Sequence, residues 1–282
     1  MFSLLFRSFV ILLLGLAVVL GVFAYWAERS AGETRVVFLD VGQGDAMLIT
    51  RGSNQVLIDG GRSGRTLLAA LSRHVPFWDR TIETVIATHP DADHIGGFPE
   101  LFARYEVDTY LDTGVRSESK IFALLEKRRE ESDTEMIRTR RGLSVAFPEG
   151  GTLTVLYPDG QTGFSNANVG SVVSRFSFGE TDFFLTGDLP HEEEHLTRIE
   201  KADILKVAHH GSKHSTSSAF LGSVRPEEAI ISVGKNSYGH PDAEVLARLA
   251  EVGVSVYRTD RDGDIVYRCV EPENGCIASV AR

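Results

Sequence analysis

Three clusters of histidine and aspartate follow closely on short apolar runs of the sequence. Residues 88–97 read THPDADHIGG and come directly after the run VIA, Asp188 lies three residues after the run TDFFL, and residues 209–212 read HHGS after ADILKVA. Short apolar runs that end in polar residues are typical of buried strands. Because open α/β sheets gather functional groups at the carboxyl ends of their strands, we expect the three clusters to meet at one edge of a sheet.

The rest of the sequence alternates between strand-like and helix-like segments, without internal repeats or low-complexity tracts. Runs rich in Val, Ile, Phe and Thr, bounded by Gly, Pro, Asp or Asn, predict strands at residues 35–41, 46–51, 55–59, 84–87, 108–111, 153–157, 171–178, 182–185, 204–207, 229–233, 255–258 and 264–268. Helical patterns cover residues 65–74, 98–104, 118–131, 191–200, 219–221 with their flanks, and 243–251. This mixture predicts one α/β domain, at residues 31–282, in which helices cover packed sheets.

The first 30 residues form a separate segment. Residues 8–26 contain no charge, Arg7 precedes them, and Tyr25 and Trp26 lie where an interfacial aromatic belt is expected. This pattern predicts a single membrane-spanning helix with the amino terminus in the cytoplasm. A cleaved signal peptide that ends near residues 22–24 and a buried core helix are the alternatives. The anchor and the signal peptide both place the following domain outside the cytoplasm.

Composition excludes several classes of protein. The chain has 282 residues and a formal net charge of −10, with 43% hydrophobic and 24% charged residues. These values exclude disordered, collagen-like and many-span membrane proteins, and the acidic balance disfavours general polyanion binding. Cys269 and Cys276 bracket the turn VEPENG. They can form a local disulfide in an oxidising compartment, and two unpaired thiols are the alternative.

Potential metal ligands are crowded into the first cluster, which contains His89, Asp91, Asp93 and His94. Imidazole and carboxylate groups without a thiolate suit zinc, manganese or iron. A solvated polar loop with helix-capping aspartates is the alternative for this motif alone.

The other two clusters are less specific when each is considered by itself. Asp188 could bridge two metal ions, although a Gly-Asp pair after a strand is more often an ordinary turn. His209 and His210 are compatible with one metal ligand and one neighbouring or substrate-contacting group, and a partly exposed polar turn is the alternative. The joint occurrence of all three clusters is far more specific than any one of them.

Further polar residues are candidates for substrate contacts. His240 could donate a hydrogen bond to a phosphate or a leaving group, and a structural histidine is equally compatible with its position before a proline. Lys213 and His214 could contact an anion, or they could simply lie on the surface. Asp40 and Asp45 flank a GQG loop that either brings backbone amides close to the site or forms an ordinary hairpin.

The motifs HPDADHIGG, LTGD and HHGS together resemble those of the metallo-β-lactamase superfamily of binuclear hydrolases. The segments FLDVGQGD, LIDGG, ADILKVAHHGSKHS, ISVGKNSYGHPD and VYRTDRDGDI resemble the ComEC-like branch of that superfamily, the hydrolase domain of a DNA-uptake channel. The resemblance covers roughly residues 35–268. The many-helix channel portion is missing here, so the chain resembles a stand-alone, membrane-tethered copy of the hydrolase part.

The resemblance implies a four-layer αββα sandwich after the N-terminal transmembrane helix, with two divalent ions, Zn or Mn, at one edge between the sheets. By motif, His89 and Asp91 belong to the first metal, and Asp93 and His94 to the second. Asp188 is expected to bridge the ions, His209 or His210 to complete the second site, and Asp59 to orient the metal loop.

Two positions depart from the wider superfamily pattern, His-x-His-x-Asp-His. Asp91 stands where the second histidine is expected, as in the ComEC-like branch. The histidine expected between the first motif and Asp188 is absent, and Asn168 or water is left to fill its place. Additional oxygen ligands favour manganese relative to a histidine-rich zinc site.

The resulting prediction is a phosphodiesterase or nuclease that uses a metal-bound hydroxide outside the cytoplasmic membrane, with Asp93, Asp188, His240 and Lys213 at the reacting centre. The resemblance favours single-stranded DNA, with a separate uptake channel as a possible partner, whereas the acidic charge favours a smaller phosphodiester. A non-catalytic, degenerate metal-binding module and a hydrolase of a lactone or β-lactam are the alternatives.

Overall fold

Two mixed β-sheets form the centre of the computed structural model, which describes residues 7–18, 20–21, 32–148, 150–160, 163–164, 166–198 and 200–280. The eight-stranded sheet has the order β15-β14-β1-β2-β3-β4-β5-β6, and the seven-stranded sheet has the order β13-β12-β11-β10-β9-β8-β7. The strands of the first sheet are β1 (Thr34–Phe38), β2 (Met47–Arg51), β3 (Asn54–Ile58), β4 (Thr81–Ile86), β5 (Glu106–Asp112), β6 (Glu135–Arg138), β14 (Ile265–Cys269) and β15 (Cys276–Val280). Those of the second are β7 (Ser144–Phe147), β8 (Gly151–Tyr157), β9 (Val173–Phe178), β10 (Thr181–Leu185), β11 (Ile204–Lys206), β12 (Glu228–Ile231) and β13 (Ser255–Arg258).

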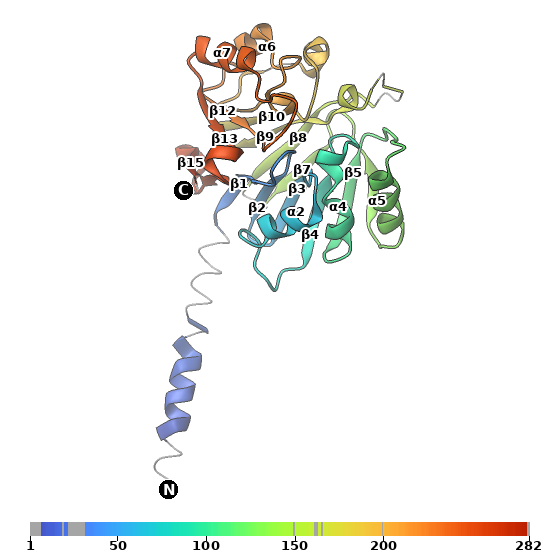
Figure 1. Ribbon diagram of the computed structural model, residues 1–282. Coiled ribbons are helices and arrows are strands. Elements are labelled where there is room, and N and C mark those ends of the chain that lie inside the picture. Colours follow the sequence, from blue (N-terminus) through green and yellow to red (C-terminus); the bar gives the residue numbers. More distant parts are fainter. Residues whose placement is uncertain are drawn as a thin grey trace.

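Helices cover the outer face of each sheet (Figure 1). The first sheet carries α2 (Gly64–Leu71), α3 (Ala92–Ile95), α4 (Phe98–Phe102) and α5 (Lys120–Glu130), and the second carries the 3-10 helix η2 (His191–Thr197), α6 (Ser218–Val224) and α7 (Ala243–Glu251). Short helices η1 (Asn168–Gly170), η3 (Ala208–Gly211), α8 (Thr259–Asp262) and η4 (Pro272–Asn274) lie in the connections. The predicted helix at 191–200 is therefore a 3-10 helix, the predicted helix at 243–251 has the same ends in the structure, and the other predicted helices are present with shifted ends.

The buried apolar residues form three clusters, which correspond to the three interfaces of a four-layer sandwich. One cluster lies between the sheets, and the other two lie between a sheet and its helices. Each central strand contributes buried apolar side chains to both faces of its sheet, because successive side chains point in opposite directions. Phe183 thus belongs to the cluster between the sheets, while its neighbour Phe184 packs against α6 through Phe220. The predicted αββα arrangement is confirmed.

Three strands were not predicted, and all of them lie at a sheet edge. β6, β7 and β15 are the terminal strands of their sheets. The central strand β2 is almost fully buried, whereas β6 contains only partly buried and exposed residues and β7 has a single buried residue, Phe147. An edge strand contacts one neighbour only and therefore needs no continuous apolar run, so the criterion that finds central strands misses it.

The direction of the strands decides where the functional residues meet. β3, β4, β5 and β6 are mutually parallel, and so are β10, β11, β12 and β13. The segment 88–97 follows β4, Asp188 follows β10, and His209 and His210 follow β11. The polar clusters of the sequence therefore leave the carboxyl ends of parallel strands in both sheets, as predicted.

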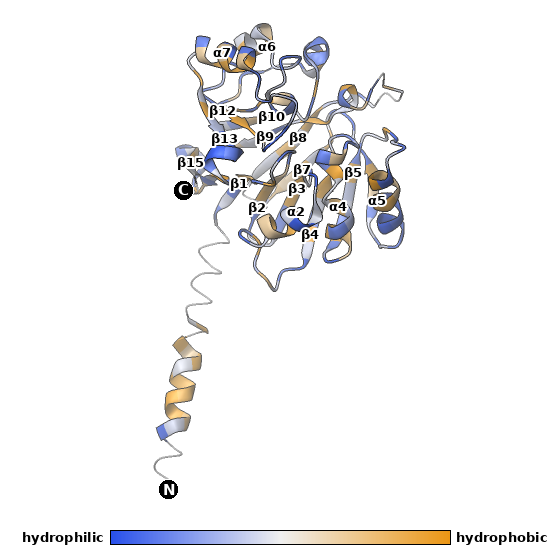
Figure 2. Ribbon diagram, in the orientation of Figure 1, coloured by the Kyte–Doolittle hydropathy of each residue, from blue (hydrophilic) through white to orange (hydrophobic). Residues whose placement is uncertain are grey.

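The N-terminal segment is described only in part. Residues 7–18 and 20–21 are helical and exposed, and Figure 2 shows their hydrophobic character. No helix within the described ranges has both the length and the apolar character that a membrane span requires. The predicted span at residues 8–26 falls partly outside the described residues and stays a prediction.

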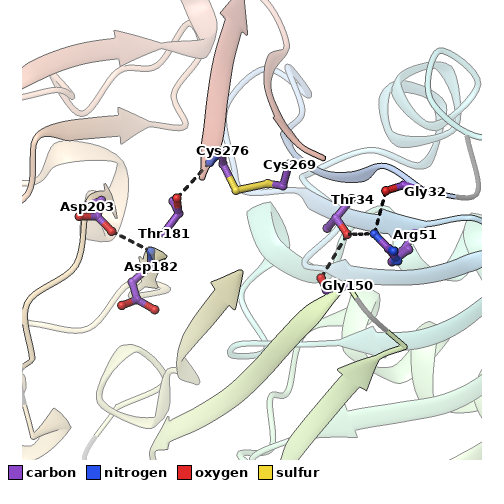
Figure 3. Close-up of a disulfide and its surroundings, with 9 residues drawn as sticks. All are labelled: Gly32, Thr34, Arg51, Gly150, Thr181, Asp182, Asp203, Cys269 and Cys276. Atoms are coloured by element: carbon purple, nitrogen blue, oxygen red, sulfur yellow. Dashed lines mark hydrogen bonds between the residues drawn. A yellow bond between two sulfur atoms is a disulfide. The ribbon is translucent and has the colours of Figure 1, made fainter. Parts of the chain in front are cut away.

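Cys269 and Cys276 form a disulfide that joins β14 to β15 (Figure 3). The two residues lie opposite each other in the antiparallel pair. The backbone N–H of Cys276 also donates to Thr181 Oγ1 at the start of β10, at 3.0 Å. The disulfide therefore closes the edge hairpin of the first sheet beside a strand of the second, and the predicted local pairing is confirmed.

Candidate metal centre

Asp188 lies at the centre of a group of four imidazole rings. Its Oδ2 atom is 3.2 Å from His94 Nε2 and 3.9 Å from His89 Nε2, both in the segment after β4. The same oxygen is 3.8 Å from His209 Nε2 and 3.7 Å from His210 Nε2, after β11. The structure thus brings together one carboxylate and four histidines that come from both sheets.

Asp59 orients the first segment from the end of β3. Its buried carboxylate accepts hydrogen bonds from the backbone N–H and the hydroxyl of Thr88, at 2.8 and 2.7 Å, and from His94 Nδ1 at 2.8 Å. Because the Thr88 hydroxyl donates to Asp59, it accepts from His89 Nδ1 at 3.0 Å. Both imidazoles therefore use Nδ1 for a protein contact and direct Nε2 toward Asp188, which is the usual orientation of metal-binding histidines.

His210 is held in the same way from the second sheet. Its Nδ1 donates to the carbonyl of Ser232 at 2.9 Å, and its Nε2 lies 3.5 Å from Asp93 Oδ2. His209 is 30% exposed and lies nearer the solvent. Both residues have positive φ, 51° and 53°, in a sharp turn after β11 that sends the two adjacent rings toward the same carboxylate. Of the pair, His210 has the better geometry for a ligand.

Several buried polar atoms of this cluster have no hydrogen-bond partner among the described residues, namely Nε2 of His89, His94 and His210 and Oδ1 of Asp188. Buried polar atoms without partners are costly and rare in native proteins. Four sets of side chains have ligand atoms within 4.8 Å of one another: His89, His94 and Asp188; Asp93, His94 and His210; Asp45, Asp188 and His210; and Asp45, Asp59 and His94. The donor set, imidazole nitrogens and carboxylate oxygens converging in a buried space, fits divalent cations such as zinc or manganese.

The electrostatics of the cluster also favour a bound cation. Burial lowers the pKa of His210, but the carboxylates of Asp188 and Asp45 outweigh it and raise the pKa to about 10. Burial opposes the charge on His94 in the same way, and Asp188 and Asp59 hold its pKa well above the ordinary value. In contrast, burial and the neighbouring His94 lower the pKa of His89 to about 3. Protons on His94 and His210 thus balance the carboxylates, and cation binding is expected to displace them.

Lys206 and Asp45 adjoin the cluster and were not recognised as a pair from the sequence. Both side chains are fully buried and form an ion pair. Lys206 Nζ also donates to the carbonyl of Gly187 at 3.0 Å, next to Asp188. A lysine inside an apolar strand that runs into a histidine pair is the sequence feature that indicates this role, because a buried ammonium needs a buried partner.

The GQG loop approaches the metal segment through its backbone. The N–H of Asp45 donates to the carbonyl of Asp93 at 3.1 Å. Gly44 has a φ of 130°, and a Cβ at this position would lie 2.2 Å from the same carbonyl. Of the two interpretations left open for this loop, close backbone approach to the site is the one that the structure shows.

The remaining candidates lie at different distances from the cluster. Asp91 is half-exposed, with Oδ2 3.7 Å from His89 Nε2. His240 is partly buried, its ring centroid is 5.6 Å from that of His209, and burial together with His209 lowers its pKa. Lys213 is exposed and lines a surface hollow with His191, His214 and Arg248. The structure does not bring Lys213 into the cluster.

Ser171, rather than Asn168, contacts the cluster at the place of the missing histidine. Its Oγ accepts from the N–H of Asp188 at 3.2 Å and lies 3.5 Å from His89 Nδ1. Asn168 belongs to η1, a short helix that ends just before Ser171, and among the described residues no contact links its side chain to the cluster. A hydroxyl that supports two candidate ligands thus stands where the sequence indicated a weak amide ligand.

Comparison with known proteins agrees with this geometry. A family model described as the Metallo-beta-lactamase superfamily matches residues 39–235. The chain is similar to ComE operon protein 3 of Bacillus subtilis (strain 168), with 35% identity over 272 residues that cover 87% of this chain and 34% of that protein. It is similar to Competence protein ComA of Neisseria gonorrhoeae, with 28% identity over 246 residues that cover 83% of this chain and 32% of that protein. The chain spans about a third of the length of these curated relatives.

Solved structures share the architecture. The metallo-beta-lactamase fold protein YhfI from Bacillus subtilis has a TM-score of 0.59 at 15% identity, over 84% of this chain and 100% of that chain. A likeness at this level of identity supports the fold and says nothing about the substrate.

We expect the Lys206→Met variant to lower the free energy of unfolding by about 3–5 kcal/mol, because it removes the ammonium that neutralises the buried carboxylate of Asp45. Urea unfolding in the presence of a chelator measures this loss. In excess Mn²⁺ the loss should shrink, since a bound cation replaces the missing positive charge. Lys201→Met, at an exposed lysine, is the matched control. Equal losses for the two variants would contradict the assigned role of Lys206.

Proposed function

The chain belongs to the metallo-beta-lactamase superfamily, and we propose that it is a metal-dependent phosphodiesterase whose favoured substrate is single-stranded DNA. The observation that carries this proposal is the convergence of four imidazoles on Asp188, with buried nitrogen atoms of which three have no hydrogen-bond partner among the described residues. Two divalent cations, when bound, supply an activated water and neutralise charge on the phosphate. No side-chain nucleophile is required.

The side chains of the protein divide the remaining work. In this proposal His89, His94, Asp93 and His210 would hold the cations, and Asp188 would contact both. Asp59 and the carbonyl of Ser232 fix the rings so that little reorganisation is needed when substrate binds.

The ring centroid of His240 is 5.6 Å from that of His209, and its buried Nδ1 atom has no hydrogen-bond partner among the described residues. It is placed to donate a proton to the leaving oxygen or a hydrogen bond to the phosphate.

The similarity to named relatives, and not the charge of the chain, is the reason to propose DNA over other phosphodiesters. The name Competence protein ComA connects a similar chain with competence, and the sequence segments resemble the ComEC-like hydrolase domain of a DNA-uptake channel. A formal charge of −10 speaks against a long electrostatic track along DNA. A short contact of a few nucleotides near the metal centre is compatible with both observations.

The proposed location is the outer side of the cytoplasmic membrane, with the N-terminal segment as a tether and a separate uptake channel as partner. The Cys269–Cys276 disulfide supports this location, because structural disulfides persist in oxidising compartments.

The Asp188→Asn variant tests the proposed chemistry. We expect chelation to abolish hydrolysis of bis(p-nitrophenyl) phosphate and single-stranded DNA, and Mn²⁺ or Zn²⁺ to restore it. Asp188→Asn should lower kcat/KM by roughly a hundredfold or more, because a bridging carboxylate contributes more than an outer partner of a metal ligand. Asp133→Asn, at an exposed aspartate, is the control. A folded protein that is inactive with every metal indicates a non-catalytic module, and turnover of nitrocefin alone indicates a carbonyl hydrolase.

The His240→Ala variant separates proton donation from phosphate binding. If His240 protonates the leaving oxygen, kcat should fall by about 10²–10⁴ for a dinucleotide, whose alkoxide leaves poorly, and much less for the p-nitrophenyl ester. An equal fall for both substrates assigns His240 to the phosphate. Unchanged turnover of both substrates leaves it a structural histidine.

Thiol labelling tests the location. Full-length protein isolated from its native cells with thiols trapped should take up no maleimide before reduction and two equivalents afterwards, because Cys269 and Cys276 are the two cysteines of the chain. Uptake of two equivalents without reduction would show that the domain folds in a reducing compartment, contrary to the proposal.

A further inference from the structure

A hollow of about 540 Å³ lies beside the metal centre, and its chemistry differs from that of the rest of this acidic protein. It is lined by Gln43, Arg62, Lys235, Asn236, Ser237 and Tyr238. Arg62 and Lys235 are exposed, and neither has an ion pair with any residue that the structure describes. In a chain with a formal charge of −10, two uncompensated cations in one hollow indicate an anionic ligand.

Two further groups in the hollow point to a ligand with a planar and polar part. The Nε2 atom of Gln43 is buried and lacks a hydrogen-bond partner among the described residues, so one amide donor remains available. Tyr238 is 64% exposed, which is unusual for a large aromatic side chain without a partner surface. An exposed ring next to cations is the combination with which proteins hold single-stranded nucleic acid.

The backbone of this hollow is well defined. Asn236 accepts from the N–H groups of Tyr238 and His240 at 3.0 and 3.1 Å, and its amide donates to the carbonyls of Gly234 and His240 at 2.9 and 2.8 Å. Gln43 Oε1 accepts from Gly234 N–H at 3.3 Å, which connects this loop to the GQG loop. The cations and the ring are thus presented by a rigid frame.

A row of aromatic rings links the hollow to the metal centre. The ring centroid of Tyr238 is 5.8 Å from that of His240, which is 5.6 Å from that of His209, whose Nε2 is 3.8 Å from Asp188. Arg62 reaches the hollow from the segment after β3. Gly61, the residue before it, forms backbone hydrogen bonds with Asp45 and Gly97. A chain of nucleotides with one phosphate at the metal centre would therefore extend toward the hollow.

We propose that this hollow is a nucleotide subsite, in which Arg62 and Lys235 bind the phosphate next to the scissile one and Tyr238 stacks on its base. This inference deepens the proposed function and rests on it for the direction of the strand. It assigns the site to single-stranded rather than double-stranded DNA, because a paired base is not available for stacking.

Fluorescence anisotropy with a labelled twelve-nucleotide oligo(dT) and the full-length protein, in chelator, measures binding without cleavage. We expect Arg62→Ala/Lys235→Ala to weaken binding at least about tenfold and to lower the slope of log K against log salt by about 1.4, for two phosphate contacts on a single strand. Tyr238→Ala should weaken binding by about five- to 150-fold, and Tyr238→Phe should retain it. Lys120→Ala/Lys201→Ala removes two exposed lysines elsewhere and should bind as the wild type does.

Hydrolysis provides a second readout. The ratio of kcat/KM for the oligonucleotide to kcat/KM for bis(p-nitrophenyl) phosphate should fall at least about tenfold in the Arg62→Ala/Lys235→Ala variant, since the small ester has no neighbouring nucleotide. Wild-type binding by that variant, equal losses for Tyr238→Ala and Tyr238→Phe, or equal competition by duplex DNA would each overturn the subsite. Binding as expected without hydrolysis of either substrate leaves the subsite in place and rejects the phosphodiesterase.

Discussion

The charge balance around Asp188 is the constraint on which the rest of the site depends. Several carboxylates lie almost without solvent at one edge of the sandwich, and burying uncompensated charge is costly. Lys206 neutralises part of this negative charge through its ion pair with Asp45, and the imidazoles of His94 and His210 lie against Asp188. Without a cation the histidines carry the missing protons, as the raised pKa values of His94 and His210 indicate. The site is therefore arranged to exchange protons for metal ions.

The fold brings these charged groups together because strands of both sheets end at the same edge of the sandwich. β4 in the first sheet and β10 and β11 in the second all end there, and the segments that follow them need only short loops to meet. The imidazole rings are then oriented by hydrogen bonds from Nδ1, as those of His94 to Asp59 and of His210 to the carbonyl of Ser232 show. The candidate metal ligands and the proposed nucleotide subsite thus lie at the same edge of the sheets, since the loop that holds Tyr238 follows β12 in the same parallel set.

Predictions from the sequence were most successful where a local pattern of residues has a single structural explanation. Apolar runs with polar ends predicted the central strands, because such runs are stable only between two packed layers. It was weakest for the edge strands β6, β7 and β15, and for side chains whose role depends on a distant partner. Ser171 is an example: nothing in its neighbourhood distinguishes it from Asn168, and its contacts with Asp188 and His89 arise only when β9 and β10 pair.

The amino-acid sequence by itself indicated an α/β domain with helices over packed sheets and the clustering of imidazoles and carboxylates at strand ends, and it offered a local disulfide as one of two alternatives, because each depends on periodicity or on neighbours in the chain. The four-layer order came from the resemblance to the superfamily. Tertiary structure alone decided that Lys206 pairs with Asp45, that His210 is held more firmly than His209, and that Lys213 lies away from the cluster. These outcomes depend on which atoms meet across the two sheets. The direction of a side chain at the end of a strand follows from a turn of the backbone, such as the positive φ of His209 and His210, that residue order does not reveal.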